Sequence, residues 1–213
     1  MCNEGINVAN VKIAGVIFDL GNVVIGWNPE HVFRDLFGED RARMDWFLTK
    51  ICPPAWNAQQ DAGYPIALAT EERVALYPAW EKEIRAYYGR WIEMISGPVP
   101  GIYELMLDIK AAGLPLYALS NWSTELFPLV ADTLPAFKLF EKTFLSGAYR
   151  MIKPEARFYE KALKEIAIPR EALIFTDDNT DNVAASNALG LKALLFTSAE
   201  QLRIDLRELG VAV

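Results

Sequence analysis

The sequence predicts an α/β fold in which a parallel sheet is flanked by helices, with a helical segment inserted after the first strand. Two observations lead to this expectation: short apolar runs alternate with helical patterns, and the alternation stops over residues 25–96. Apolar strands that alternate with helices are typical of a parallel sheet buried on both faces. The chain of 213 residues is 52% hydrophobic, enough for one core and a small second lobe. The apolar runs occupy residues 12–18, 114–119, 143–145, 172–176 and 191–196.

The first apolar run is rich in Val and Ile and stops at Asp19, which predicts a buried strand followed by a turn over residues 19–22. The later runs are separated by segments in which apolar residues recur at helical spacing. One of these segments presents mainly small residues and could pack close to a sheet. The helical patterns cover residues 102–109, 155–167 and 183–189.

The segment that interrupts the alternation shows helix signals and no convincing strand. Asn28 and Pro29 suit a helix start, and Gly38 suits the end of that helix. Five of the six tryptophans fall in this segment, which predicts a helical cap with its own aromatic core. The chain is therefore expected to form a discontinuous Rossmann-like core, residues 1–24 and 97–213, with a cap at residues 25–96. Further helices are expected at residues 41–51, 70–77 and 79–95.

Composition excludes several classes of function. The formal net charge is −7, so binding to nucleic acid or to an anionic membrane is not expected. The single histidine, His31, excludes a zinc site built from several histidines. Cys2 and Cys52 are too few for a disulfide scaffold and are expected to be reduced thiols in a cytoplasmic protein. No apolar run is long enough for a signal peptide or a membrane span.

Polar side chains follow four of the predicted strands, directly in three cases and shortly after residues 143–145 in the case of Lys153. Ligands bind beyond the carboxyl ends of the strands in an open parallel sheet, so these side chains are candidates for one shared site. Asp19 and Asp178 would supply the oxygen ligands that Mg²⁺ prefers, and the hydroxyl, amide and ammonium groups would donate to phosphate oxygens. The candidates are Asp19, Ser120, Asn121, Lys153, Asp177 and Asp178.

Each candidate also has an ordinary structural interpretation. An Asp at a strand end is commonly a turn residue, and Ser120 and Asn121 could cap a helix that begins near Ser123. Lys153 could lie on the surface, and acidic residues at 177–181 could simply favour a helix start. The functional interpretation is favoured because all four groups fall at strand ends. Two adjacent carboxylates at a buried edge also repel each other unless a cation is near.

Four motifs carry these candidates in a consistent order. They are Val16-Ile17-Phe18-Asp19-Leu20-Gly21-Asn22-Val23, Leu119-Ser120-Asn121, Lys153-Pro154-Glu155, and Phe175-Thr176-Asp177-Asp178 with Asn182 and Gly190 downstream. The set resembles the motifs of the haloacid dehalogenase-like (HAD) hydrolase superfamily over residues 16–196. The helical insert falls where that superfamily carries its C1-type cap. The Asp-Leu-Gly-Asn turn and the Asp-Asp-Asn run are similar to those of the glucose-1-phosphatase-like HAD phosphatases.

The resemblance implies roles for the matched residues. Asp19 would be the nucleophile that forms an aspartyl-phosphate, which water then hydrolyses. Mg²⁺ would be held by Asp19, the Gly21 main-chain carbonyl and Asp178, with Asp177 as a further ligand or beside the ligands. Lys153 would neutralise charge on Asp19 and the phosphate. Ser120, Asn121 and Lys153 would bind the transferring phosphoryl group.

Gly21 departs from the pattern of this superfamily. Most of its phosphatases carry a second Asp at this position, which protonates the leaving oxygen and later activates water. General acid–base assistance contributes about 10²–10⁴ in rate, so its loss should be felt. Three outcomes are open: the leaving group needs no acid, as with a sugar anomeric oxygen; another group, such as a cap residue, supplies the proton; or turnover is poor and the protein mainly binds.

Three functional hypotheses follow from these residues. The favoured one is a Mg²⁺-dependent phosphatase acting on a small phosphate monoester, plausibly a sugar phosphate. A 2-haloacid dehalogenase needs no acid at position 21, but it also needs no metal, and the pair Asp177 and Asp178 argues against it. A non-catalytic phosphate-binding relative is the third. Magnesium dependence separates the first two, and capture of a phosphoryl mimic on Asp19 without turnover would favour the third.

Substrate choice is expected to lie in the cap. Residues 56–63 are polar and predict a specificity loop, in which Trp56 could stack on a sugar ring and Asp61 could accept sugar hydroxyls. An equally open interpretation is a plain loop between helices with Trp56 in the cap core. Trp27 and Trp122 could wall the site or merely pack. The expected partner is a small phosphorylated metabolite, and the expected state is a monomer or weak homodimer.

Overall fold

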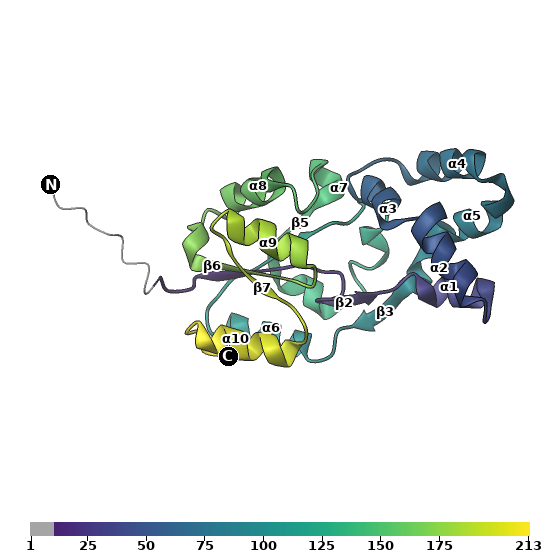
Figure 1. The fold of residues 1–213 in the computed structure, drawn as a ribbon. Helices are drawn as coiled ribbons and strands as arrows, with labels where there is room; N and C mark the ends of the chain where they lie inside the picture. Colours follow the sequence, from purple (N-terminus) through teal and green to yellow (C-terminus); the bar gives the residue numbers. More distant parts are fainter. Residues whose placement is uncertain (1–10) are drawn as a thin grey trace.

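The computed structural model describes residues 11–213 and shows a parallel sheet between two layers of helices (Figure 1). Within these residues the sheet has the order β5-β4-β1-β6-β7, and every neighbouring pair is parallel. The chain builds outward from β1 through β4 to β5, then returns to β1 and builds through β6 to β7. The strand order therefore reverses beside β1, where open parallel sheets bind ligands. The strands are β1 Gly15–Phe18, β4 Leu116–Ser120, β5 Phe140–Leu145, β6 Leu173–Asp177 and β7 Lys192–Leu195.

Alternating side chains of the central strands enter two separate clusters of buried residues. Val16 and Phe18 of β1 pack with α6 (Ile102–Ala111) and α10 (Ala199–Glu208). Ile17 packs on the opposite face with residues of α8 (Ala156–Ile166), next to α9 (Thr180–Ala188). All residues of β1 and β6 are buried, because both faces of the sheet are covered. The α/β prediction is confirmed.

The segment between β1 and α6 is mainly helical, and a two-stranded ribbon leads into it and out of it (Figure 1). The strands β2 (Ile25–Trp27) and β3 (Ile95–Pro98) pair antiparallel in a sheet of their own. The expectation of no strand over residues 25–96 was therefore wrong at both ends. Strands of three and four residues are too short to show a period of two in the sequence. The helices are α1 Glu30–Phe37, α2 Arg41–Trp46, α3 Pro54–Asp61, α4 Ile66–Leu76 and α5 Glu81–Gly89, with a π-helical stretch at Phe47–Ile51 and 3₁₀ turns at Pro78–Trp80 and Trp91–Met94.

Several element boundaries agree with the sequence, and others differ. The Asn28 side chain accepts from the Glu30 N–H, and α1 ends before Gly38, as expected. The prediction of a loop at residues 56–63 was wrong, because α3 covers most of these residues. The expected helix near Ser123 is only a short turn, in which Ser123 Oγ accepts from the Glu125 N–H.

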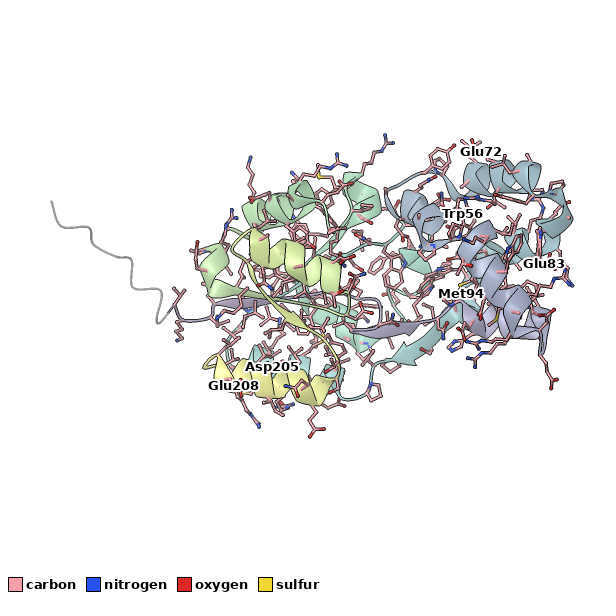
Figure 2. The ribbon with its side chains drawn as sticks, in the orientation of Figure 1. Trp56, Glu72, Glu83, Met94, Asp205 and Glu208 are labelled. Carbon is pink, nitrogen blue, oxygen red and sulfur yellow. The ribbon has the colours of Figure 1, made fainter. Side chains whose placement is uncertain are left out.

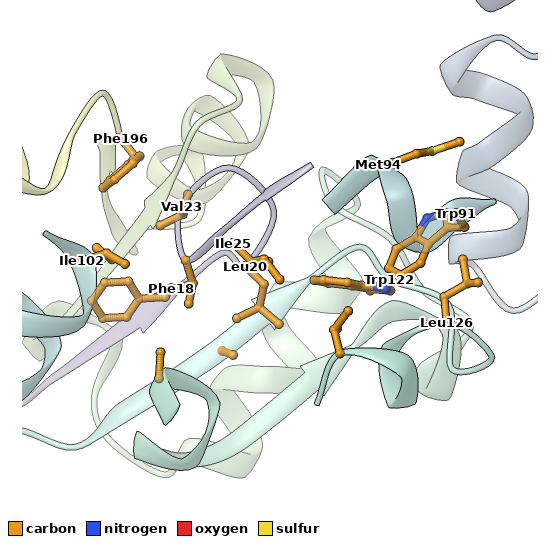
Figure 3. Close-up of a cluster of buried hydrophobic side chains, with 14 of the residues drawn as sticks. Phe18, Leu20, Val23, Ile25, Trp91, Met94, Ile102, Trp122, Leu126 and Phe196 are labelled. Atoms are coloured by element: carbon orange, nitrogen blue, oxygen red, sulfur yellow. The ribbon is translucent and has the colours of Figure 1, made fainter. Parts of the chain in front are cut away.

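The aromatic core of the cap is continuous with one face of the sheet. Phe33 packs against Phe47 and Tyr87, with ring centroids 4.8 and 5.9 Å apart. The same buried cluster continues into the core (Figure 3), where Trp91 meets Trp122 at 5.8 Å. The cap thus contains the expected aromatic core, and this core is not separated from the core that lies on the sheet. The exact division into residues 1–24, 25–96 and 97–213 stays a prediction.

The composition led to expectations about the two cysteines and about membrane-spanning helices. Cys52 is buried and unpaired among the described residues, and burial raises the pKa of its thiol to about 12. Cys2 lies outside the described residues. In the part of the chain that the structure describes, every helix is too short or too polar to cross a membrane.

Candidate active site

Three carboxylates meet at the carboxyl ends of β1 and β6. Asp19 directly follows β1, Asp177 ends β6, and Asp178 follows it. One oxygen of each lies within 4.8 Å of the others. Two ligands on opposite sides of Mg²⁺ lie about 4.2 Å apart, so the cluster has the size of a magnesium site.

Lys153 lies between two of these carboxylates. Its Nζ is 2.9 Å from Asp19 Oδ1 and 2.6 Å from Asp177 Oδ2, and the side chain is only 1% exposed. Burial alone would lower the pKa of Lys153, but the two ion pairs outweigh it and raise the pKa. Lys153 is therefore a permanent cation that orients the Asp19 carboxylate.

The electrostatic balance of the site leaves room for a further cation. Burial raises the pKa of Asp19 to about 6, although Lys153 opposes the shift, and the negative charge of Asp177 adds to it. The pKa of Asp178 is also raised, by burial and then by Asp177. One lysine thus does not fully compensate three carboxylates. The oxygen donors and their excess negative charge fit a bound Mg²⁺.

Asp177 is saturated with hydrogen bonds. Besides Lys153, it accepts from Asn182 Nδ2 at 3.1 Å on both oxygens and from the Asn179 N–H at 2.8 Å. It is fully buried, whereas Asp178 is exposed. Asp177 therefore organises the site, and Asp178 is the better placed of the two to bind a metal. The sequence motif contained Asn182, but its contact with Asp177 was not expected.

The turn after β1 connects the carboxylates to the ribbon of the cap. Gly21 lines the cavity, and a Cβ built on it would meet no heavy atom within 4 Å. Asn22 adopts a left-handed conformation (φ 55°), and its side chain accepts from the Trp27 N–H and donates to Asp178 Oδ2. Position 21 therefore has room for a side chain.

Ser120 and Asn121 reach the site in different ways. Ser120 ends β4, is buried and lies close enough to Asp19 for its hydroxyl to lower the pKa of that carboxyl group. Asn121 lines the cavity, but its Nδ2 donates to the Lys153 carbonyl at 2.9 Å and its Oδ1 accepts from the Lys153 N–H at 2.8 Å. The Asn121 side chain thus holds the Lys153 loop, which is a different task from the predicted contact with phosphate.

Asp61 comes from the cap and faces the same cavity as Asp19. It ends α3, and its main-chain carbonyl accepts from Ser146 Oγ at 2.5 Å, which ties this end of the helix to the core. The contact is close: a Cβ on Gly63, two residues later, would lie 2.8 Å from the Gly147 carbonyl. Asp61 is therefore held in place over the floor of the site.

Trp56 does not line the cavity, in contrast to the predicted role at the substrate. Its side chain is 4% exposed and packs against Tyr87 and Tyr88 on α5, with centroids 5.3 Å away in both cases. Figure 2 places it on α3 among the helices of the cap. Trp56 and Gln60 are four positions apart on α3, so both side chains point inward, and the Trp56 side chain belongs to the cap core.

The remaining walls of the cavity are largely apolar. Trp27 and Trp122, which the sequence left open, do line it, and Trp91 and Leu126 were not expected. Trp122 and Trp91 come from distant parts of the chain, so no local pattern links them. His31 is exposed on α1 and does not line the cavity.

Comparison with known proteins decides the family. A family model described as a haloacid dehalogenase-like hydrolase matches residues 13–190. The chain belongs to this family. It is thus a HAD-like hydrolase, and the resemblance of its four motifs is confirmed.

The relatives and solved structures that resemble this HAD-like hydrolase match different fractions of its chain. It is 27% identical to the sesquiterpene phosphatase astK of Aspergillus oryzae, over 91% of this chain and 94% of the relative. It is 36% identical to the drimenol cyclase drtB of Aspergillus calidoustus, but only over 44% of this chain and 18% of that much longer protein. A HAD family enzyme from Bacteroides thetaiotaomicron, solved as a magnesium complex, has the same fold, with a TM-score of 0.67, 22% identity and coverage of 88% and 95%.

Proposed function

We propose that this HAD-like hydrolase cleaves small phosphate monoesters in a Mg²⁺-dependent reaction with Asp19 as the nucleophile. The observation that carries the proposal is the placement of Asp19. Its carboxylate is paired with buried Lys153 at 2.9 Å, belongs to the three-carboxylate cluster and faces the cavity. A phosphatase among the relatives that match nearly the whole chain supports this choice of reaction.

The chain's own residues can be assigned tasks in that reaction. Lys153 and Ser120 hold the Asp19 carboxylate so that one oxygen can attack phosphorus. Attack forms a bond between Asp19 and phosphorus and breaks the bond to the ester oxygen; water then displaces Asp19. Asp19, Asp178 and the Gly21 carbonyl would hold Mg²⁺, which would supply positive charge for the phosphoryl oxygens.

The cavity walls favour an apolar leaving group over a sugar. Three indole rings and Leu126 line the walls, whereas the amides of Asn57, Asn121 and Asn182 are already bonded to protein groups. The cavity has a volume of about 140 Å³, close to the ~150 Å³ of an apolar cavity that takes benzene. The phosphatase named for sesquiterpenes points the same way. We therefore revise the expected substrate from a sugar phosphate to a small alkyl or isoprenyl monophosphate.

A substrate panel tests this choice. A C5 isoprenyl monophosphate should be hydrolysed with kcat/KM roughly 10-fold or more above glucose 1-phosphate, because burying five apolar carbons is worth more than 1.4 kcal/mol. Phosphate release is measured for both esters under identical conditions. The opposite order of kcat/KM would restore the sugar phosphate. Trp91→Ala should lower kcat/KM for the isoprenyl ester more than for the sugar ester.

Magnesium should stabilise the protein as well as activate it. A ligand at 100 times its Kd that binds only the folded state adds about 2.7 kcal/mol to the free energy of unfolding. We therefore expect Mg²⁺ to raise the melting temperature, Asp178→Asn to abolish most of that rise, and EDTA to remove activity. Asp181→Asn, which changes an exposed neighbouring carboxylate, is the matched control. Full phosphatase activity in EDTA without any thermal shift would contradict the proposed magnesium dependence, and release of halide from a 2-haloacid in EDTA without phosphate-ester cleavage would favour the metal-free dehalogenase.

A further inference from the structure

We propose that Asp61 of the cap is the general acid of the reaction, in place of the carboxyl group that Gly21 lacks. The proposal deepens the proposed function and rests on it. An alkyl phosphate needs such an acid, because an alkoxide is a poor leaving group. The core lacks an acid because position 21 is glycine, and we infer that the cap supplies one through Asp61.

The lining of the cavity singles out Asp61. Its acidic and basic side chains are Asp19, Asp61 and Lys153. Asp19 is the nucleophile, and Lys153 is bound to two carboxylates that hold its proton. The remaining members are Gly, Trp, Leu, Asn and Ser, none of which is a proton donor of suitable strength. Asp61 is left as the donor that can act on the leaving oxygen.

Hydrogen bonds hold the Asp61 carboxyl group in a defined orientation. Asn57 Nδ2 donates to Asp61 Oδ2 at 2.8 Å, and the Ser123 main chain lies close enough to the carboxyl group to oppose the rise of its pKa. The Asn57 side chain is itself held by the Tyr88 hydroxyl, which lies 2.9 Å from Asn57 Oδ1. Asn57 is therefore a positioning residue. Among the described residues, no hydrogen bond joins Asp61 to the three carboxylates proposed to surround Mg²⁺.

The surroundings of Asp61 keep its proton in place at neutral pH. Burial raises the pKa of Asp61 to about 8; the Ser123 N–H opposes the shift, and the negative charge of Asp19 adds to it. The tyrosines Tyr87 and Tyr88 on α5 face Asp61, and their pKa values are raised too, chiefly by burial. Other ionisable groups around this part of the cavity are Lys153, Glu125 and Cys52.

The proton balance closes over the two half-reactions. In the first, an Asp19 oxygen bonds to phosphorus, the bond from phosphorus to the ester oxygen breaks, and the Asp61 proton passes to that oxygen, so that an alcohol leaves. In the second, the Asp61 carboxylate takes a proton from water while the water oxygen bonds to phosphorus. The bond to Asp19 then breaks, inorganic phosphate leaves, and Asp61 is protonated again.

Leaving-group dependence separates an acid from a structural residue. Asp61→Asn keeps an oxygen for the hydrogen bond from Asn57 but carries no acidic proton. We expect kcat/KM for the C5 isoprenyl monophosphate to fall by about 10²–10⁴. With 2,4-dinitrophenyl phosphate, whose phenolate leaves unprotonated, kcat/KM should change by less than about threefold. Asp45→Asn, which changes an exposed carboxylate on α2, should leave both values unchanged.

Two further readouts belong to the same experiment. In the wild type, kcat/KM for the isoprenyl ester should fall above about pH 8 as Asp61 loses its proton, and Asp61→Asn should lack this limb. Adding Gly21→Asp to Asp61→Asn should restore activity on the isoprenyl ester at least 10-fold, because position 21 has room for a side chain facing the same cavity.

The outcomes distinguish failure of this inference from failure of the proposed function. Equal losses on both esters in Asp61→Asn would make Asp61 structural, and no loss on either would make it irrelevant; each result overturns the inference. A wild type that cleaves neither ester in the presence of Mg²⁺ would instead remove the proposed function.

Discussion

We expect Asp19→Asn to abolish turnover of every phosphate ester that the wild type cleaves, including 2,4-dinitrophenyl phosphate. An amide cannot form the covalent intermediate, so kcat should fall by roughly 10⁴-fold or more, as when the nucleophile of another covalent hydrolase is removed. The loss should be independent of the leaving group, unlike that of Asp61→Asn. Asp181→Asn again serves as the control, because this carboxylate is exposed on α9 and outside the three-carboxylate cluster. Steady-state phosphate release measures the effect.

Although Asp19→Asn should remove activity, it should raise the free energy of unfolding. The Asp19 pKa is about 6 in the folded protein, above its ordinary value of 3.8, so the folded state binds more protons between these values. The contribution of Asp19 to the free energy of unfolding therefore falls as pH rises from about 4 to 6 and stays low above 6. Without metal at pH 7, Asp19→Asn should unfold at a higher urea concentration than the wild type. A lower midpoint, or residual turnover on dinitrophenyl phosphate, would contradict the assignment.

Lys153→Met should have the largest effect on stability. The methionine has a similar length but no charge, and it leaves Asp19 and Asp177 facing each other in a buried site. Removing one partner of a buried ion pair costs about 3–5 kcal/mol, because the remaining charge is uncompensated. The loss should grow as pH rises, since carboxylates without a counter-ion are tolerated only when protonated. Activity should also be lost, because the buried cation that pairs with the proposed nucleophile is gone.

Urea unfolding of Lys153→Met at pH 5 and pH 7.5 tests this expectation, with Lys142→Met as the control. Lys142 is exposed and paired with Glu165 on the surface, where an ion pair is worth at most about 1 kcal/mol. Adding Mg²⁺ should recover part of the stability that Lys153→Met loses, because the metal is a substitute cation. If both lysine variants are equally stable, the buried charge cluster does not have the importance assigned to it.

The sequence predicts the core of the site well because local rules position it. Each of Asp19, Ser120, Lys153 and Asp177 stands at or shortly after a strand end, and a parallel sheet brings such ends together whatever the loops do. The order of the motifs was enough to predict which side chains meet. What local rules did not predict is the partner of each group, such as the bonds from Asn121 to the Lys153 main chain.

The cap is less predictable because long-range contacts position it. The hydrogen bond from Ser146 Oγ to the Asp61 carbonyl joins residues 85 positions apart, and no local sequence pattern predicts it. The helix that carries Asp61 did have a signal, since Pro54 at its first position follows a common helix-start rule. Trp91 and Trp122 lie 31 positions apart and meet at 5.8 Å in the folded structure, beside the β2–β3 ribbon and the turn that follows β4. The composition of these walls, on which the proposed substrate preference rests, could therefore not be predicted from the sequence alone.

Detection of a phosphoryl group on Asp19 is the most direct test of the account. The wild type is mixed with dinitrophenyl phosphate and Mg²⁺, quenched in acid within milliseconds and reduced with borohydride, which converts an aspartyl-phosphate to homoserine. Peptide mass spectrometry then locates the product. We predict homoserine at position 19, in an amount matching the burst of dinitrophenolate, and more of it in Asp61→Asn, where breakdown is slow. Catalytic turnover without modification of Asp19, or with the phosphoryl group on another residue, would contradict the central claim.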